Sequence, residues 1–296
     1  MSVKVLAPAK VNLYLGVEKN KGKKPNVSGD FHYLKTIIHP LDFGDEVTII
    51  KANSFEFVMQ GSEAPDQLSK EDNLAYKAAL LFAEHFDISL GCKIIIEKHI
   101  PAQAGLGGGS SDAAAVLYGL NKFFDLKIET DELIALAKDL GSDVCAFLYQ
   151  KPVLMGNFGD EFIESFNPLR SPVLLLKPAA GVSTADAYKG FDEFPDLVFP
   201  IDLMLIGMRT NDAEIVGTHV ANNLELTAVD LVPDIAKAQA WLSDQAGACV
   251  AHITGSGSCV FAMFDTEAEA QQAYKAAQSQ PFWSQLTHLS EGLRLL

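Results

Sequence analysis

Four of the five residues at positions 105–109 are glycine, and two serines, Ser110 and Ser111, follow them directly. Such a run does not favour a regular strand or helix, because glycine loses more conformational freedom on folding than any other residue. It does let the backbone approach a ligand closely and point several N–H groups in one direction. A helix that begins after the run would add the partial positive charge of its N-terminus at the same place. The run therefore predicts a phosphate-binding loop.

The plainer alternative is a flexible turn followed by a helix that Ser110 or Ser111 caps. It accounts for one serine and one glycine but leaves the other glycines unexplained, so we prefer the phosphate loop. Two familiar loops are excluded. No lysine follows the last glycine, as the pattern G-x-x-x-x-G-K-[ST] requires, and Ser110 stands where the pattern G-x-G-x-x-G needs its last glycine.

Strand-like and helix-like segments are mixed along the chain and do not alternate regularly. Alternating or short apolar runs predict strands at residues 3–7, 11–17, 37–41, 46–51, 93–97, 173–176, 248–253 and 259–264. In the second of these, Val11, Leu13 and Leu15 are expected to share one face. Capping residues and apolar spacing predict helices that start at Asp72 or Ser69, at Ser110 or Ser111, at Thr130 and at Thr266, with others near residues 183–189 and 235–242. This order favours an α+β fold of two layered domains.

A cluster of turn formers at residues 167–172 is the best candidate for a domain boundary. We therefore expect a first domain over residues 1–166 and a second over residues 167–296. A polar segment at residues 18–30, which carries Lys19, Lys21, Lys23 and Lys24, is expected to be a loop.

The chain has 38 acidic and 23 basic side chains, for a net charge of −15. This balance argues against nucleic-acid binding, which needs a dense basic face, but allows small anionic ligands. No apolar run approaches the ~18 residues that a membrane span needs, and the N-terminus is too interrupted for a signal peptide. The four cysteines form no C-x-x-C pair, so reduced thiols are expected. We expect a cytoplasmic protein that has neither nucleic acid nor membrane as a partner.

Three further segments carry residues suited to chemistry. Lys10 lies at residues 8–13 between two predicted strands, where solvent is the ordinary surrounding of a lysine. Asp143 follows a predicted helix, where a carboxylate ordinarily caps or closes a turn. The turn at residues 254–259 is either a flexible hairpin or a second glycine-lined wall for phosphates, and the residues alone leave both interpretations open.

Taken in order, the segment around Lys10, the run GLGGGSSDAAA from Gly105, the segment around Asp143 and the turn at residues 254–259 resemble the motifs of the GHMP kinase superfamily. The resemblance spans residues 8–264. The triple glycine before the serine pair is similar to that of the superfamily's 4-diphosphocytidyl-2-C-methyl-D-erythritol-phosphorylating members, whereas homoserine and mevalonate kinases usually show a shorter G-L-G-S-S core. The resemblance implies a ribosomal-protein-S5-like first domain, a ferredoxin-like second domain and an active site in the cleft between them.

The same resemblance implies an enzyme that uses ATP and Mg²⁺ to phosphorylate the 2-hydroxyl of that substrate, in non-mevalonate isoprenoid precursor synthesis. Asp143 would be the general base and Lys10 its cationic partner. Nucleotide contacts would come from Asn73, Lys98, Pro101, Gly105, Leu106, Gly107, Gly108, Gly109, Ser110 and Ser111, with Ser111 also ligating the metal. Phosphoryl transfer needs mainly positioning and charge stabilisation, which this set of groups can supply.

For the second substrate, the resemblance implies that Phe31 stacks on the cytosine ring, His32 hydrogen-bonds its edge and Tyr188 covers its other face. Asn12, Gly255 and Ser256 complete the implied substrate contacts. Residues 29–32 read Gly-Asp-Phe-His, where the family commonly reads Asp-Gly-Tyr-His. Core aromatics at Phe31 and Tyr188, and an ordinary loop histidine at His32, remain the alternatives.

Two other functions fit the residues. Another kinase of the superfamily, homoserine- or mevalonate-kinase-like, would share the ATP site, but CDP and CMP would not compete with its acceptor substrate. A non-catalytic nucleotide-binding relative would be expected to lose Lys10 or Asp143, and both are present. The residues allow either a monomer or a homodimer.

Overall fold

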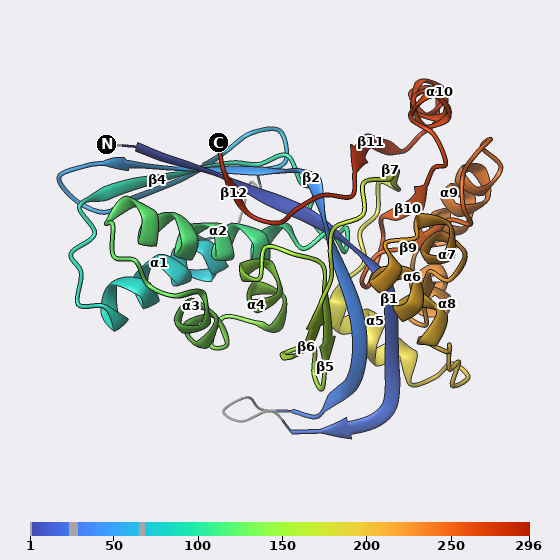
Figure 1. The fold of residues 1–296 in the computed structure, drawn as a ribbon, viewed down its shortest axis with the longest axis horizontal. Coiled ribbons are helices and arrows are strands. Elements are labelled where there is room, and N and C mark those ends of the chain that lie inside the picture. Colours follow the sequence, from blue (N-terminus) through green and yellow to red (C-terminus); the bar gives the residue numbers. More distant parts are fainter. Residues whose placement is uncertain (1, 24–28, 65–68) are drawn as a thin grey trace.

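The computed structural model describes residues 2–23, 29–64 and 69–296, and the strands within these residues form two sheets (Figure 1). The first sheet contains β1 (Ser2–Gly22), β2 (Phe31–Lys51), β3 (Glu56–Gln60), β4 (Cys92–Glu97), β5 (Val153–Gly156), β6 (Glu161–Ser165), β8 (Ala221–Asn222) and β12 (Arg294–Leu295). The second sheet has the order β11 (Trp283–His288), β7 (Pro172–Lys177), β10 (Val260–Met263) and β9 (His252–Ile253).

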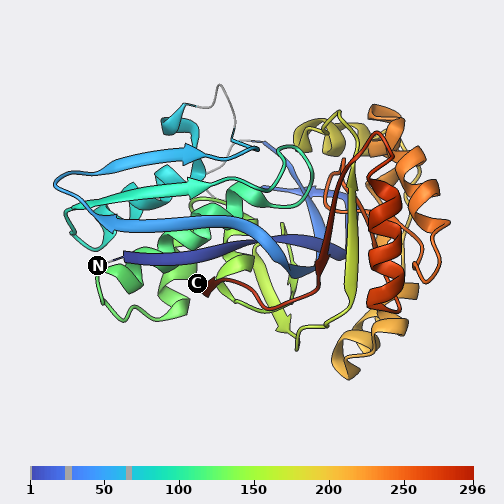
Figure 2. The same ribbon diagram turned by 90° about the horizontal axis from the view of Figure 1, so that it is seen from above.

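The helices pack on these sheets in two groups. One face of the first sheet is covered by α1 (Leu74–His85), α2 (Gly108–Phe123), α3 (Thr130–Ala137) and α4 (Ser142–Leu148), as Figures 1 and 2 show. The second group gathers around the second sheet and consists of α5 (Thr184–Phe191), α6 (Asp202–Thr210), α7 (Ala213–Thr218), α8 (Glu225–Leu231), α9 (Asp234–Ser243) and α10 (Glu267–Ala277). A 3-10 helix, Lys70–Asp72, precedes α1.

The apolar core follows from two-residue periodicity in strands that are buried on both faces. In β7, Val173 and Leu175 belong to a cluster that also contains residues of β1 and β2, while Leu174 and Leu176 belong to a cluster shared with α5, α8, α9 and α10. A further cluster joins the first sheet to α1–α4. The two sheets are therefore packed together through apolar side chains, and the α+β class that the sequence predicts agrees with this layering.

Strand β1 is continuous across the two segments that the sequence predicts, and its irregularities decide which side chains reach the site. The register against β2 shifts between Pro8 and Lys10 and again between Asn12 and Tyr14. Up to Leu13 the expected alternation holds, but after the second shift Tyr14 joins the cluster between the sheets and Leu15 joins the other one. The expectation that Leu15 shares a face with Leu13 is wrong, because an irregularity of this kind changes the face of every later residue.

Helix starts agree with the sequence in part. Thr266 caps α10, and Ser183 caps α5. Asn73, rather than Asp72 or Ser69, caps α1, while Ser69 caps the short 3-10 helix before it.

The polar segment at residues 18–30 is expected to be a loop, but residues 18–22 belong to β1, which ends at Gly22. The expectation of a loop is therefore wrong for this part. Within it, the Lys19 ammonium donates a hydrogen bond of 2.7 Å to the Phe194 carbonyl, so this part of β1 is held against the α5 region. Lys24 lies outside the described residues. The domain boundary between residues 166 and 167 stays a prediction. Two short strands from beyond it, β8 and β12, pair with β1 in the first sheet.

Candidate active site

A cavity of about 1070 Å³ collects nearly every residue that the sequence singled out. Its walls come from β1, the start of β2, the glycine run, the first turn of α4, the start of α5 and the turn after β9. The lining includes Lys10, Asn12, Phe31, His32, Asn73, Lys98, Pro101, Gly105, Leu106, Gly107, Gly108, Gly109, Ser110, Asp143, Tyr188, Gly255 and Ser256. Ser111 is absent from the lining.

Lys10 is buried rather than solvated, because it projects from β1 into this cavity. Its ammonium donates to the side-chain oxygen of Asn12, whose amide nitrogen donates in turn to the Thr36 hydroxyl over 2.7 Å. The Asn12 backbone N–H donates to the Thr254 hydroxyl over 3.1 Å. This network fixes the position of the ammonium from both sheets.

The glycine run follows Pro101 and closes over Lys10. The backbone N–H of Lys10 donates to the Leu106 carbonyl over 3.0 Å, and Gly107 adopts the left-handed conformation, with φ of 74°. A Cβ at Gly107 would lie 3.1 Å from Cγ of Lys10 and 3.0 Å from the Phe147 ring, so the tight contact and the left-handed backbone together favour glycine.

Helix α2 begins at Gly108, and its N-cap is Gly107, which makes no side-chain capping bond. The alternative that Ser110 or Ser111 caps this helix is therefore wrong. The first amides of a helix, here those of Gly108, Gly109 and Ser110, have no carbonyl within the helix to bind. They lie at the cavity wall, so they are available to an anionic ligand.

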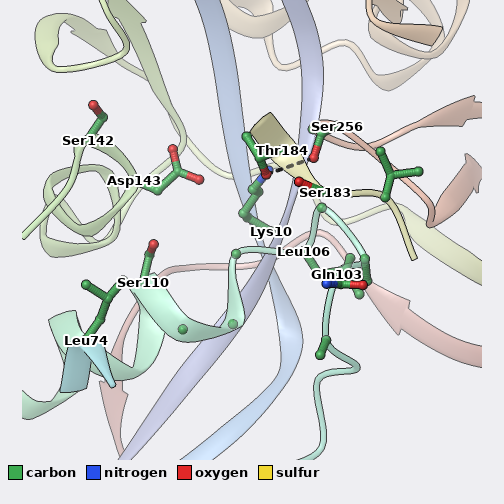
Figure 3. Close-up of a pocket in the computed structure, with 18 of the residues that line it drawn as sticks. Lys10, Leu74, Gln103, Leu106, Ser110, Ser142, Asp143, Ser183, Thr184 and Ser256 are labelled. Carbon is green, nitrogen blue, oxygen red and sulfur yellow. Dashed lines mark hydrogen bonds between the residues drawn. The ribbon is translucent and has the colours of Figure 1, made fainter. Parts of the chain in front are cut away.

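Asp143 lies in the first turn of α4, directly after Gly141 and Ser142. In Figure 3 its carboxylate and the Ser110 hydroxyl point toward the same space, which the Lys10 side chain borders from the opposite side. Burial lowers the pKa of Lys10, and the negative charge of Asp143 partly opposes that change. The cavity thus presents a carboxylate, an ammonium and a row of helix amides around one volume.

The turn at residues 254–259, for which the sequence left two interpretations open, forms part of the cavity wall through Gly255 and Ser256. Its backbone is bonded to the glycine run: Cys259 N–H donates to the Ala104 carbonyl over 3.2 Å. The hydroxyls of Ser256 and Thr184 lie 3.1 Å apart, which links the turn to the start of α5 (Figure 3). Sequence reasoning missed Thr184, since nothing marks it apart from ordinary residues of a helix start.

Part of the cavity wall is aromatic. His32 is buried, with its ring 5.7 Å from the Tyr188 ring and its Nδ1 2.9 Å from the Glu18 carbonyl. Burial lowers the pKa of His32, Asp192 opposes this, and Lys21 and Lys19 add to it. The ring centroids of Phe31 and Phe158 lie 6.3 Å apart. Phe158 also lines the cavity, and no sequence pattern indicated it.

Family models match both halves of the chain. The model described as "GHMP kinases N terminal domain" matches residues 73–151, and that described as "GHMP kinases C terminal" matches residues 204–281. A curated 4-diphosphocytidyl-2-C-methyl-D-erythritol kinase from Exiguobacterium sibiricum is 34% identical over 280 residues, covering 93% of each chain. The chain belongs to the 4-diphosphocytidyl-2-C-methyl-D-erythritol kinase family of GHMP kinases. The predicted membership and the GHMP-kinase-like fold are confirmed.

Solved structures agree with this assignment. A crystal structure of 4-(cytidine 5'-diphospho)-2C-methyl-D-erythritol kinase superimposes with a TM-score of 0.76 at 28% identity, and the match covers 97% of this chain and 99% of that one. Homoserine kinase from Cytophaga hutchinsonii, at 22% identity and a TM-score of 0.75, shares the fold; the match covers 100% of this chain and 97% of that one. The chain is thus an ATP-dependent small-molecule kinase. In the described part of the chain, no helix is both long and apolar enough to span a bilayer.

Of three residues predicted to contact the nucleotide, Ser111 lies outside the cavity lining, whereas Asn73 and Lys98 line the cavity but are also engaged by the protein itself. Ser111 is fully buried inside α2, and its hydroxyl has no hydrogen-bond partner among the described residues. The predicted metal ligand at Ser111 therefore does not fit, and Ser110 is the serine that faces the cavity. The Asn73 side-chain oxygen caps α1 by accepting from the backbone N–H groups of Ala75 and Tyr76. Lys98 is held in ion pairs with Asp45 and Asp112.

Proposed function

We propose that this kinase transfers the γ-phosphoryl group of ATP to the 2-hydroxyl of 4-diphosphocytidyl-2-C-methyl-D-erythritol, in non-mevalonate isoprenoid precursor synthesis. The names of the relatives support the substrate class. The observation that carries the proposal is one cavity lined by Asp143, Lys10, the glycine run and an aromatic group with His32. That arrangement suits two nucleotide-like substrates whose reacting groups meet within the cavity.

In the proposed reaction, the acceptor hydroxyl oxygen forms a bond to the γ-phosphorus of ATP, and the bond from that phosphorus to the β,γ-bridging oxygen breaks. Asp143 accepts the hydroxyl proton, and ADP leaves with the electron pair of the broken bond. The α2 amides of Gly108, Gly109 and Ser110 bind the triphosphate oxygens. Lys10, oriented by Asn12, stabilises the negative charge on the transferring group.

We propose that Mg²⁺ enters with ATP rather than in a cage built by the protein alone. Among the described residues, no group of three or more His, Cys, Asp or Glu side chains could hold a metal ion. Magnesium commonly uses one or two carboxylates together with substrate phosphates, and Asp143 and the Ser110 hydroxyl are oxygen donors that fit this pattern. When bound, the metal would neutralise charge on the triphosphate.

At the aromatic wall, we propose that the cytosine of the acceptor lies between Phe31 and Tyr188 and that His32 recognises its edge. Because burial lowers the pKa of His32, the ring is neutral near pH 7. Its Nδ1 lies 2.9 Å from the Glu18 carbonyl and its Nε2 lies 3.5 Å from a carboxylate oxygen of Asp192, so both ring nitrogens face protein oxygens. We propose that Nε2 exchanges this carboxylate for the edge of the base when the acceptor binds.

We also propose that the protein is cytoplasmic and that its partners are small molecules. The four cysteines are free thiols, as a reducing compartment would keep them. The net charge of −15 disfavours binding to nucleic acid.

The proposal is tested by measuring ADP formation with 4-diphosphocytidyl-2-C-methyl-D-erythritol, homoserine and mevalonate as acceptors. We expect turnover with the first alone, and competition against it by CMP. Turnover with homoserine or mevalonate that CMP does not inhibit would replace the proposed substrate with that of another GHMP kinase.

A further inference from the structure

A buried charge cluster lies beside the glycine run, outside the groups that the proposed reaction uses, and two of its members, Lys98 and Asp112, also line the cavity. The Lys98 ammonium bonds to carboxylate oxygens of both Asp45 and Asp112, the latter at 2.5 Å. The exposed fractions of the three side chains are 8%, 0% and 3%. Asp45 comes from β2, Lys98 follows β4, and Asp112 lies near the start of α2, so three separate elements meet at one ammonium.

The cluster holds the chain on both sides of the glycine run. The second oxygen of Asp45 accepts the backbone N–H groups of His99 and Ile100, at 2.5 and 2.8 Å, in the segment that precedes the run. Asp112 belongs to the helix in which the run ends. A Cβ at Gly108 would lie 3.5 Å from the Asp45 carboxylate and 3.1 Å from Ile100, so the first helical residue is packed directly on these groups.

The charges in the cluster neutralise one another and so offer little attraction to an anionic ligand. Two carboxylates share one ammonium, and Oδ1 of Asp112 has no hydrogen-bond partner among the described residues. Burial raises the pKa of Asp112 to about 8, against the opposing effect of Lys98. Burial lowers the pKa of Lys98, but the two carboxylates outweigh it, so the lysine stays charged. The cluster therefore carries no net positive charge with which to attract a triphosphate.

We propose that Asp45, Lys98 and Asp112 act together as positioning residues that fix the glycine run in its phosphate-binding shape. Lys98 holds the two carboxylates and does not contact the triphosphate. The inference rests on the proposed ATP site. It opposes the expectation of a direct contact between Lys98 and the nucleotide, and the two accounts differ in the sign of one measurable effect.

That effect is the change in ATP binding when a carboxylate is neutralised. If Lys98 contacts ATP, Asp45→Asn frees the ammonium and strengthens binding. If the cluster positions the run, Asp45→Asn weakens binding by about tenfold, because an amide nitrogen then faces the ammonium and the entrance to the run shifts. Asp45→Asn changes few atoms, so this comparison remains available even if removal of the lysine prevents folding.

We would measure ADP binding by calorimetry, together with KM for ATP and for the acceptor, in wild type, Asp45→Asn, Lys98→Met and the double variant. If the cluster positions the run, each single variant raises the KM for ATP about tenfold and leaves the KM for the acceptor within twofold. The double variant then binds the nucleotide about as weakly as the weaker-binding single variant. Lys77→Met, at an exposed site on α1, is the matched control and is expected to bind ADP as wild type does.

Tighter ADP binding by Asp45→Asn, or additive effects in the double variant, would overturn the proposal. Wild-type affinity in both single variants would overturn it as well and would leave the proposed function intact. Absence of ADP binding by the wild type would instead contradict the proposed function.

Discussion

The contact between the glycine run and the turn at residues 254–259 predicts a large effect for the smallest substitution, Gly105→Ala. Gly105 has φ of 71°, which costs a residue with a Cβ about 1 kcal/mol. The added Cβ would lie 2.0 Å from the Thr254 carbonyl oxygen, so the two segments must separate by about 1 Å. Separation would break the hydrogen bonds between them, which are already 3.2 to 3.3 Å long.

Three such bonds, donated by Ser258 N–H, Cys259 N–H and the Thr254 hydroxyl, contribute about 1 kcal/mol each. The substitution should therefore destabilise the protein by about 4 kcal/mol and lower Tm by about 6 °C. Thermal unfolding followed by circular dichroism measures this change. Gly109→Ala is the matched control for stability, because its Cβ meets no atom within 4 Å. Equal Tm values for the two variants would refute the argument that the turn packs on the run.

Three further predictions concern the cavity and the strand behind it. Phe31→Ala should raise the KM for the cytidine substrate about tenfold by removing a stacking face, with little change in the KM for ATP, and equal changes in both would contradict the stacking role. Ser110→Ala should raise the Mg²⁺ concentration needed for half-maximal activity, because it removes an oxygen donor, whereas Ser111→Ala should not, and the reverse result would return the metal ligand to Ser111. Burial lowers the pKa of His39 to about 4, whereas in the unfolded chain this histidine titrates near 6.5. Its contribution to the free energy of unfolding is therefore fully present above pH 6.5 and falls by about 3 kcal/mol as the pH decreases to 4. The free energy of unfolding in urea, measured at several pH values, should show this loss in wild type and a smaller loss in His39→Gln. The same dependence of that free energy on pH in both proteins would contradict the prediction.

Much of the site could be predicted from the sequence because its residues depend on local backbone form. The glycine run, the helix after it and the strand before it are adjacent in the chain, and their joint use as an anion site follows from the residues themselves. The order of the motifs around Lys10, Asp143 and the turn at residues 254–259 then indicated the family, which the comparisons confirm.

The remainder depends on tertiary contacts that no local pattern reports. The register shifts in β1 place Tyr14 and Leu15 on faces opposite to those the alternation predicts. The family resemblance implied a nucleotide contact for Lys98, and only the fold brings it to Asp45, which lies 53 residues away. The two serines after the glycines are chemically equivalent, and the rotation of α2 alone decides that Ser110 faces the cavity.

The central claim is that Asp143 takes the proton of an acceptor hydroxyl while the glycine run holds ATP. It is tested most directly by the single-turnover rate of phosphoryl transfer from γ-labelled ATP to 4-diphosphocytidyl-2-C-methyl-D-erythritol in Asp143→Asn, with exposed Asp139→Asn as the matched control. The account predicts that Asp143→Asn binds ATP as wild type does but transfers the phosphoryl group at least about a hundredfold more slowly, while Asp139→Asn is unaffected. A transfer rate near that of wild type in Asp143→Asn would contradict it.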